Sequence, residues 1–300
     1  MIIGLSFLAV LTFFGLTYLI RPIVDPDFFW HLKTGEWLWL ERSWPIPDPF
    51  SCTSPEVLNL SQTFIIKGYW LCQLLYFLFY SAFGWFGLIV IRFMLFSALL
   101  YVLWTGRRGD LPVWTGLGLV FLISLLAMFP VDRPQFFSFV FFAGLYLYLD
   151  RCFAEQRFVK KGHILLASGL MLVWGNFHGG VMLGQGLLIL AGCCAGISFL
   201  FNRGTKTPID YRGLRGFILA CLLASVCNPG ILTRPLHVLH VVGGSLNLMS
   251  SVNEEYASVF DLWKSHQFLP LIPYAPFFCF GLWGLVRGLR TQPVVAMLVR

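Results

Sequence analysis

The sequence predicts an all-α protein, a polytopic bundle of about eight or nine transmembrane helices. Of the 300 residues, 58% are hydrophobic and only 12% are charged, and the mean hydropathy is +0.77. Soluble domains carry about 25% charged residues. Apolar runs alternate with short basic loops along the chain, as in proteins that cross a bilayer repeatedly. The net charge of +7 resides in those loops, so it does not indicate a nucleic-acid partner.

The distribution of basic residues predicts the topology. Thirteen of the 21 Lys and Arg residues lie in the loops 106–111, 151–163, 202–216 and 287–300, and seven lie in the segments 21–68, 131–134, 175–180 and 227–268. Short basic loops stay on the cytoplasmic side of a membrane. We therefore expect a cytoplasmic N-terminus and an outward-facing segment 21–68, with the polar turns near residues 132, 176 and 228 on the same outer side.

The first apolar run, residues 2–20, lacks a basic leader and a small-residue cleavage site, so we expect a retained helix. The first outer loop, residues 21–68, follows it. Within this loop, residues 28–40 are rich in Trp and Phe with charged residues between them, which predicts an amphipathic helix in the membrane interface. The prolines at positions 45, 47, 49 and 55 predict an irregular second half.

Residues 69–82 are apolar but shorter than the roughly 20 residues that a crossing needs. We expect a re-entrant or interfacial helix there, because a crossing would invert every later loop against the charge bias. The remaining spans are predicted at residues 86–104, 113–129, 136–149, 164–174, 181–201, 217–226 and 269–286. Together they form a single domain, residues 1–300, with a second, amphipathic outer loop at residues 228–266.

Asp25 and Asp27 are the first candidate site residues, and Pro26 between them drives Asp25 toward an extended conformation. Carboxylates fixed at a lipid–water boundary are costly, which favours a functional role. They would act as a general base on an acceptor hydroxyl or bind a divalent metal. The structural alternative is that Asp27 caps a helix beginning near Phe28.

Two arginines are candidate phosphate ligands. Arg92 lies inside a predicted span, where it would contact the phosphate of a lipid-linked substrate or, alternatively, pair with an acidic residue or reach the interface. Arg133 lies in the tight turn 132–135, where it would clamp a phosphate or pair with Asp25.

The remaining candidates lie in outer turns. His178, beside two glycines, would line a cavity or be a hydrogen-bonded turn residue. Glu254 would supply a further carboxylate or belong to a solvated loop. His237 and His240 are three residues apart, but no third ligand is near them in sequence, so we favour an interfacial helix and predict no metal site there. The eight cysteines show no CxxC spacing and are expected to pack. Phosphate-binding glycine loops, GxSxG and HExxH are all missing from the sequence.

Several motifs carry a resemblance to a known family: DPDFFWHLKTGEWL, DPFSCTSP, DRPQFFSF, WGNFHGG and NPG. With the cytoplasmic N-terminus and the acidic first outer loop, the chain resembles bacterial members of the C-type glycosyltransferase (GT-C) superfamily, which transfer sugars from polyprenyl-phosphate carriers on the periplasmic face. The 300 residues are fewer than is usual for that superfamily, and we expect no soluble C-terminal domain among them, so the resemblance also allows a truncated or repurposed member.

The resemblance implies a multi-pass protein of the bacterial inner membrane with its site facing the periplasm. Asp25 would be the catalytic base, Asp27 would assist it or hold a metal, and Arg92, Arg133, His178 and Glu254 would bind substrate. The implied partners are a lipid-linked sugar donor and membrane lipids. The alternative is a non-catalytic subunit that packs against partner membrane subunits. A transporter is the weakest of the three interpretations, because no inverted repeat is visible.

Overall fold

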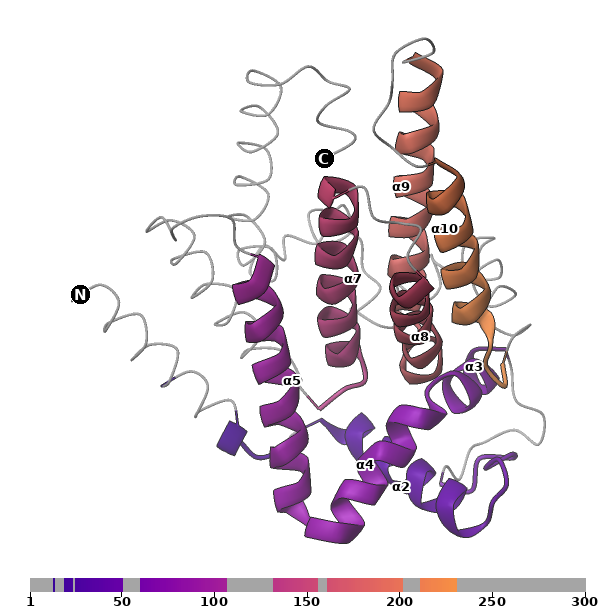
Figure 1. The fold of residues 1–300 in the computed structure, drawn as a ribbon. Coiled ribbons are helices and arrows are strands. Elements are labelled where there is room, and N and C mark those ends of the chain that lie inside the picture. Colours follow the sequence, from indigo (N-terminus) through magenta and orange to yellow (C-terminus); the bar gives the residue numbers. More distant parts are fainter. Residues whose placement is uncertain are drawn as a thin grey trace, which may run out of the picture.

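In the computed structural model the described residues are 13, 19–23, 25–50, 60–106, 132–155, 161–201 and 211–230. These residues form eight α-helices and no strand, which confirms the predicted all-α class (Figure 1). The helices are α2 (Pro26–Leu40), α3 (Leu60–Gly68), α4 (Trp70–Phe83), α5 (Trp85–Gly106), α7 (Gln135–Glu155), α8 (Lys161–Phe177), α9 (Val181–Phe201) and α10 (Tyr211–Val226).

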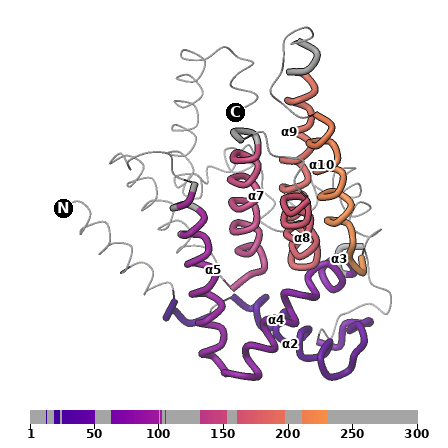
Figure 2. Tube along the Cα trace, viewed as in Figure 1, coloured from indigo at the N-terminus to yellow at the C-terminus, as the bar shows by residue number. Residues whose placement is uncertain are grey.

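The helices fall into an upright group and a group that closes one end of it. Figure 1 shows α5, α7, α9 and α10 standing roughly alongside one another, while α4 runs obliquely beneath them next to α2. α2 packs on α4, and α8 packs mainly on α10. Following the trace in Figure 2, the chain passes from α2 and α4 at this end into the upright α5. We refer to the end of the upright group that α2 and α4 close as the α2/α4 end.

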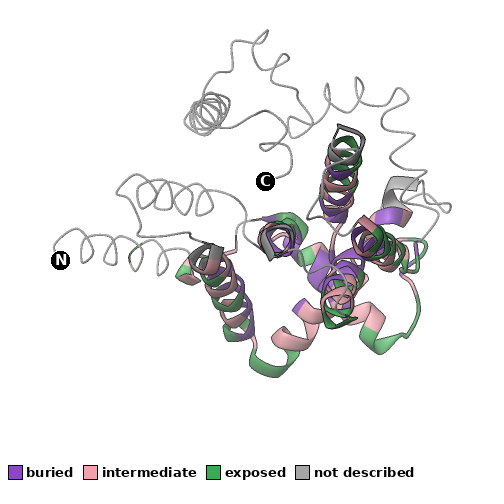
Figure 3. Ribbon diagram, turned by 45° about the horizontal axis from the view of Figure 1, so that its top comes forward, coloured by how far each residue is buried: buried purple, intermediate pink, exposed green. Residues whose placement is uncertain are grey.

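Two apolar clusters hold the described helices together. The first joins α2, α4, α5 and α7 around Phe28, Tyr76 and Leu88, all of them buried. The second joins α7, α8, α9 and α10 around Trp174, Leu188 and Phe217, which are fully or almost fully buried. In Figure 3, which looks more nearly along the upright helices, the buried residues lie on their inward sides and the exposed residues on their outward sides. Burial of these aromatic and aliphatic side chains is the main favourable contribution to the fold.

α2 begins two residues earlier than predicted, and the predicted cap is wrong. The N-cap is Asp25, not Asp27: its backbone is extended (φ −75°, ψ 115°) and its carboxylate accepts a hydrogen bond from the Asp27 amide. Pro26 occupies the first turn, because its locked φ suits a helix start and its missing N–H would have no partner there. The extended conformation of Asp25 agrees with the prediction. α2 ends at Leu40, and Arg42 then adopts a left-handed φ of 52° and stacks over Trp39.

The first loop is irregular only in part. Residues 41–50 contain no helix, as their prolines predict, whereas residues 60–68 form α3, which the sequence analysis missed. α3 starts beyond the last proline, and nothing in its sequence interrupts a helix. α4 is the short apolar segment predicted at 69–82, and it lies across the α2/α4 end rather than upright in the bundle (Figure 1).

Three helices, α7, α8 and α10, extend further than the predicted spans because they continue through charged residues at the end away from α4. In the described part of the chain, no helix combines the length and the apolar character needed to cross a membrane. The predicted spans 113–129 and 269–286 lie outside the described residues, as do nearly all of span 2–20 and the second outer loop beyond residue 230.

Two glycines allow helices to touch backbone to backbone. A Cβ at Gly35 of α2 would overlap the carbonyl oxygen of Gln73 in α4, and a Cβ at Gly175 of α8 would overlap the carbonyl oxygen of Ser225 in α10. Neither obstacle is a flexible side-chain end, so an added methyl group would push the helices apart. These contacts set the distance at which α2 lies on α4 and α8 on α10.

We predict that Gly35→Ala destabilises the protein by about 1–3 kcal/mol, the usual cost of overpacking. Gly186→Ala in α9 is the matched control, because its new Cβ would meet nothing within 4 Å. The control should be neutral or stabilising, since Ala is the better helix former. The unfolding midpoints of the two purified variants test this. Equal midpoints would show that α2 and α4 do not approach as closely as described.

Candidate functional site

The centre of the candidate site is an ion-pair cluster formed by Asp25, Asp27 and Arg133. Arg133 lies just before α7 and donates from Nε to Asp25 Oδ2 and from Nη2 to Asp25 Oδ1, the latter at 3.2 Å. The same Nη2 lies 3.0 Å from Asp27 Oδ2. One guanidinium thus bridges both carboxylates at the α2/α4 end. The sequence predicted that Arg133 would either clamp a phosphate or pair with Asp25, and the structure shows the pair with Asp25.

The two carboxylates differ in access. The Asp25 side chain is only 5% exposed, and its oxygens accept from Arg133 and from the Asp27 amide. The Asp27 side chain is 61% exposed and is held by one ion pair. An outside molecule can therefore reach Asp27 but meets Asp25 only if the ion pair opens.

A second ion pair lies beside the first. Arg92 of α5 donates from Nε to Asp132 Oδ1 at 2.6 Å and from Nη2 to Asp132 Oδ2 at 2.8 Å, and both side chains are buried. Its Nη1 donates to the backbone carbonyls of Leu19 and Arg21 at 3.0 and 2.6 Å. Arg92 thus forms a structural pair with an acidic residue, which the sequence analysis gave as an alternative to phosphate binding. It anchors the chain that leads into Asp25.

His178 is held in a network at the start of α9. Its Nδ1 accepts from the Gly180 amide at 2.9 Å and lies 2.7 Å from Ser138 Oγ, which accepts from Trp174 Nε1 at 2.8 Å. Because Nδ1 accepts from a backbone N–H, the proton of the neutral ring is on Nε2. The predicted alternative of a hydrogen-bonded turn histidine describes this arrangement. The Tyr69 ring, 4.9 Å away between centroids, is a further neighbour.

His31 of α2 is a buried histidine to which the sequence analysis gave no role. Its Nδ1 lies 3.1 Å from Gln73 Nε2, and its ring lies 5.9 Å from that of Tyr69. Burial lowers the pKa of His31 to about 4; Asp25 acts against this by raising the pKa, and Arg133 lowers it further. His31 is therefore neutral at pH 7 and accepts at Nδ1. Among the described residues, the buried Gln73 Oε1 has no hydrogen-bond partner.

Asn176 links three helices by hydrogen bonds at the α2/α4 end. Its Oδ1 accepts from Trp70 Nε1 at 2.7 Å, and its Nδ2 donates to the carbonyl oxygens of Leu172 and Cys227 at 2.8 and 2.9 Å. The start of α4 and the ends of α8 and α10 thus meet at one side chain. The expectation that the turns near 132, 176 and 228 gather with Asp25 at one end agrees with this geometry.

The predicted site residues are therefore brought together in part. Asp25, Asp27 and Arg133 are in direct contact, Arg92 adjoins them through Asp132, and His178 lies at the same end. Glu254, His237 and His240 lie outside the described residues. The sequence analysis missed His31, Tyr69, Gln73 and Ser138. Gln73 had a signal, since it is the one amide in the otherwise apolar α4, and such a residue needs a buried partner.

The arrangement of Asp25 and Asp27 does not suit a divalent metal. The guanidinium of Arg133 occupies the place between them that a cation would take. Within the described ranges, no three His, Cys, Asp or Glu side chains are grouped to hold a metal ion.

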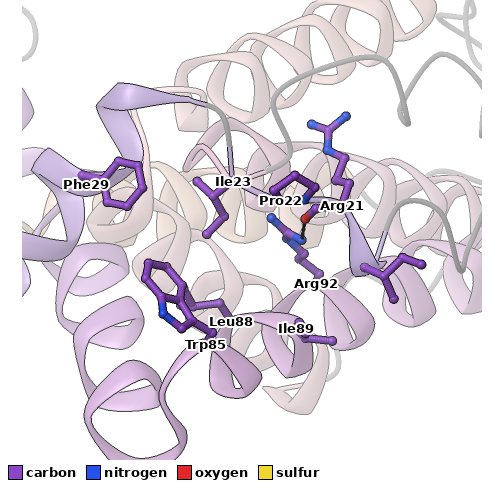
Figure 4. Close-up of a pocket in the computed structure, with 9 residues that line it drawn as sticks. Arg21, Pro22, Ile23, Phe29, Trp85, Leu88, Ile89 and Arg92 are labelled. Carbon is purple, nitrogen blue, oxygen red and sulfur yellow. Dashed lines mark hydrogen bonds between the residues drawn. The ribbon is translucent and has the colours of Figure 1, made fainter.

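A pocket of about 330 Å³ opens next to the ion pairs, between residues 20–23, the first turn of α2 and the start of α5 (Figure 4). Arg92 lines it, but Asp25, Asp27 and Arg133 do not. Asp25, Arg92 and Arg133 therefore do not all line this pocket.

Comparison with family models, with curated proteins and with solved structures finds no match to this chain. The site must therefore be interpreted from its own geometry. That geometry offers one accessible carboxylate, a guanidinium beside it, and a neutral histidine buried behind them.

We predict that Asp132→Leu destabilises the protein by about 3–5 kcal/mol, because it leaves the buried Arg92 cation without its carboxylate. The double variant Arg92→Met/Asp132→Leu should be less destabilised than the sum of the two single variants, since both charges are gone. Unfolding free energies from a denaturant titration measure all three. Strict additivity would mean that the two side chains do not interact.

We also predict a pH dependence that originates in His31. Its folded-state pKa of about 4 lies below the ordinary value of 6.5, so between these pH values the unfolded chain binds a proton that the folded protein does not. Stability from this group is complete above pH 6.5 and is lost as the pH falls to 4, by about 3 kcal/mol at most.

The control for this pH dependence is His31→Gln, whose side-chain oxygen can accept from Gln73 but does not titrate. The difference in unfolding free energy between wild type and this variant should change across pH 4–6.5. A difference that is constant with pH would show that His31 titrates normally in the folded protein.

Proposed function

We propose that the protein is a multi-pass bacterial inner-membrane protein of the GT-C type that transfers a sugar from a polyprenyl-phosphate donor to an acceptor on the periplasmic face. The observation that carries this proposal is the meeting of Asp25 and Asp27, from the first loop, with Arg133, more than 100 residues later. A carboxylate open to an acceptor, placed beside a guanidinium, suits a displacement at the anomeric carbon in which a phosphate is the leaving group.

The membrane location is supported by the outward faces of four helices. They carry large apolar side chains that are exposed on α5, α8, α9 and α10: Phe93, Met94, Leu165, Leu166, Leu183, Ile189, Leu190, Leu219 and Leu223. Exposed apolar surface of this extent on several helices marks a protein or membrane contact. With this location, α4 and α2 would lie in the outer interface and the upright helices would face lipid.

The difference in access redistributes the roles expected of the acids. Asp27 would be the general base, because its carboxylate is largely exposed. Asp25 would be a positioning residue, because its buried carboxylate holds Arg133 in place. Arg92, paired with Asp132, would fix the chain before α2 and would not touch substrate.

The reaction would be a direct displacement. The Asp27 carboxylate takes the proton of the acceptor hydroxyl as that oxygen bonds to the anomeric carbon of the sugar. The bond between the anomeric carbon and the phosphate oxygen breaks, and polyprenyl phosphate leaves. Negative charge grows on the phosphate at this point, and Arg133 is the guanidinium placed to stabilise it. His178, with its proton on Nε2, would line the far side of the site.

A non-catalytic subunit of a larger membrane complex is the second candidate. It is favoured because both arginines already have partners inside the protein. Arg133 bridges both acids, and Arg92 binds Asp132 and two backbone carbonyls. In such a subunit both ion pairs would serve only to hold the fold, and the exposed apolar faces would meet partner membrane proteins.

We predict that Asp27→Asn lowers sugar transfer by about 100-fold or more, the range that a general base supplies. The readout is transfer from a polyprenyl-phosphate sugar to an acceptor by protein reconstituted in vesicles. Because Asp27 is exposed, the variant should retain the wild-type amount of folded protein. Glu41→Gln, at the exposed C-cap of α2, is the matched control and should keep full activity.

Asp25→Asn should lower both activity and the amount of folded protein, because it removes the buried carboxylate that pairs with Arg133, although Asn can still cap α2. Wild-type transfer by Asp27→Asn would exclude Asp27 as the base. The absence of any transfer by the wild-type protein across the donors and acceptors tried would favour the subunit.

A further inference from the structure

The pocket beside α5 has a lining that differs from the acidic site next to it. Its walls are apolar and come from Ile20, Ile23, Phe29, Trp85, Leu88 and Ile89 (Figure 4). A volume of about 330 Å³ is at the small end of ligand pockets, which hold about 300–1,000 Å³. The volume is too small for a whole lipid, and the apolar walls suit a hydrocarbon chain better than a sugar.

The charges at the pocket argue against an anionic occupant. Arg92 reaches its inner end, but its charge is balanced by Asp132, and its donors also serve the carbonyls of Leu19 and Arg21. In Figure 4 the Arg21 guanidinium points away from Leu88 and Ile89. A phosphate placed against Trp85, Leu88 and Ile89 would be surrounded by apolar walls, and the cation at that end, Arg92, is already balanced by Asp132, so the cost of desolvating the phosphate would not be offset.

The pocket continues into an apolar stripe on α5. Trp85 and Ile89 line the pocket, and Phe93 follows at the same four-residue spacing, so the three side chains lie on one face of the helix. Trp85 and Phe93 are more than half exposed. The stripe is about 12 Å long at 1.5 Å per residue. A chain seated in the pocket can thus run on along α5 without leaving apolar surface.

We propose that this pocket binds one acyl chain of a membrane phospholipid, which lies against α5 and the residues leading into α2. The bound chain fills the space between residues 20–23 and α5, directly before the segment that carries Asp25. It is a resident lipid and not the sugar donor. This inference rests on the membrane location in the proposed function, but not on catalysis.

The test is photo-crosslinking in nanodiscs with a phospholipid that carries a diazirine on its acyl chain, followed by peptide mapping. We expect label on residues 20–23 and 85–89 that saturates at one lipid per protein and survives delipidation in detergent. The exposed face of α9, with Leu183 and Ile189, is the internal control. Its label should not saturate and should be lost on delipidation.

Two variants sharpen the test. Ile89→Trp places a larger ring in the pocket and should lower the label at residues 20–23 by about tenfold, equivalent to about 1.4 kcal/mol of lost affinity. Leu183→Trp makes the same kind of change on the control face and should leave that label unchanged. Ile23→Trp fills the pocket from the opposite wall, so a misfolded Ile89→Trp protein does not end the test.

Equal labelling and equal loss of label at the pocket and at α9 would overturn the inference. Displacement of the pocket label by an equimolar amount of polyprenyl phosphate would also overturn it, because the pocket would then belong to the donor. In either case the proposed function stands, provided that the protein is inserted in the bilayer. Failure to insert would instead remove both proposals.

Discussion

The ion pair between Arg133 and the buried Asp25 is the interaction on which the described architecture depends. It joins the first loop to the start of α7 and places α2 against the bundle. Burying the Asp25 carboxylate is costly, and its attraction to Arg133 offsets that cost only when the hydrogen bonds are well satisfied. Here Asp25 also caps α2, so the same carboxylate both starts the helix and fixes its position. α4 then lies on α2 through the close contact at Gly35.

The ion pairs of this site could be anticipated from the sequence because the chain has few charged residues. In a chain with 12% charged residues, a basic residue in an apolar surrounding has few acidic partners within reach. This is why pairing of Arg133 with Asp25, and of Arg92 with an acid, could be named in advance as alternatives to phosphate binding. The extended Asp25 follows from Pro26, and the short α4 follows from the length of its apolar run, because both are local properties.

The parts that the sequence did not predict depend on how the helices are rotated against one another. The contacts of His31 with Gln73 and of His178 with Ser138 join residues about 40 positions apart, on helices whose register only packing decides. The carbonyls that Arg92 binds carry no side-chain signal at all. The N-cap was misassigned because two neighbouring aspartates both suit that role, and only the proline between them selects the first.

Asp132 and Arg133 are neighbours of opposite sign, and each holds a partner of the opposite sign on a different element. The order of these two residues therefore determines that Asp132 pairs with α5 and Arg133 pairs with the first loop. Written as Arg-Asp, the same dipeptide would set guanidinium against guanidinium at α5 and carboxylate against carboxylate at the first loop. The order of charges in this turn therefore disfavours a fold in which the turn is inverted, because like charges would then repel each other at both contacts.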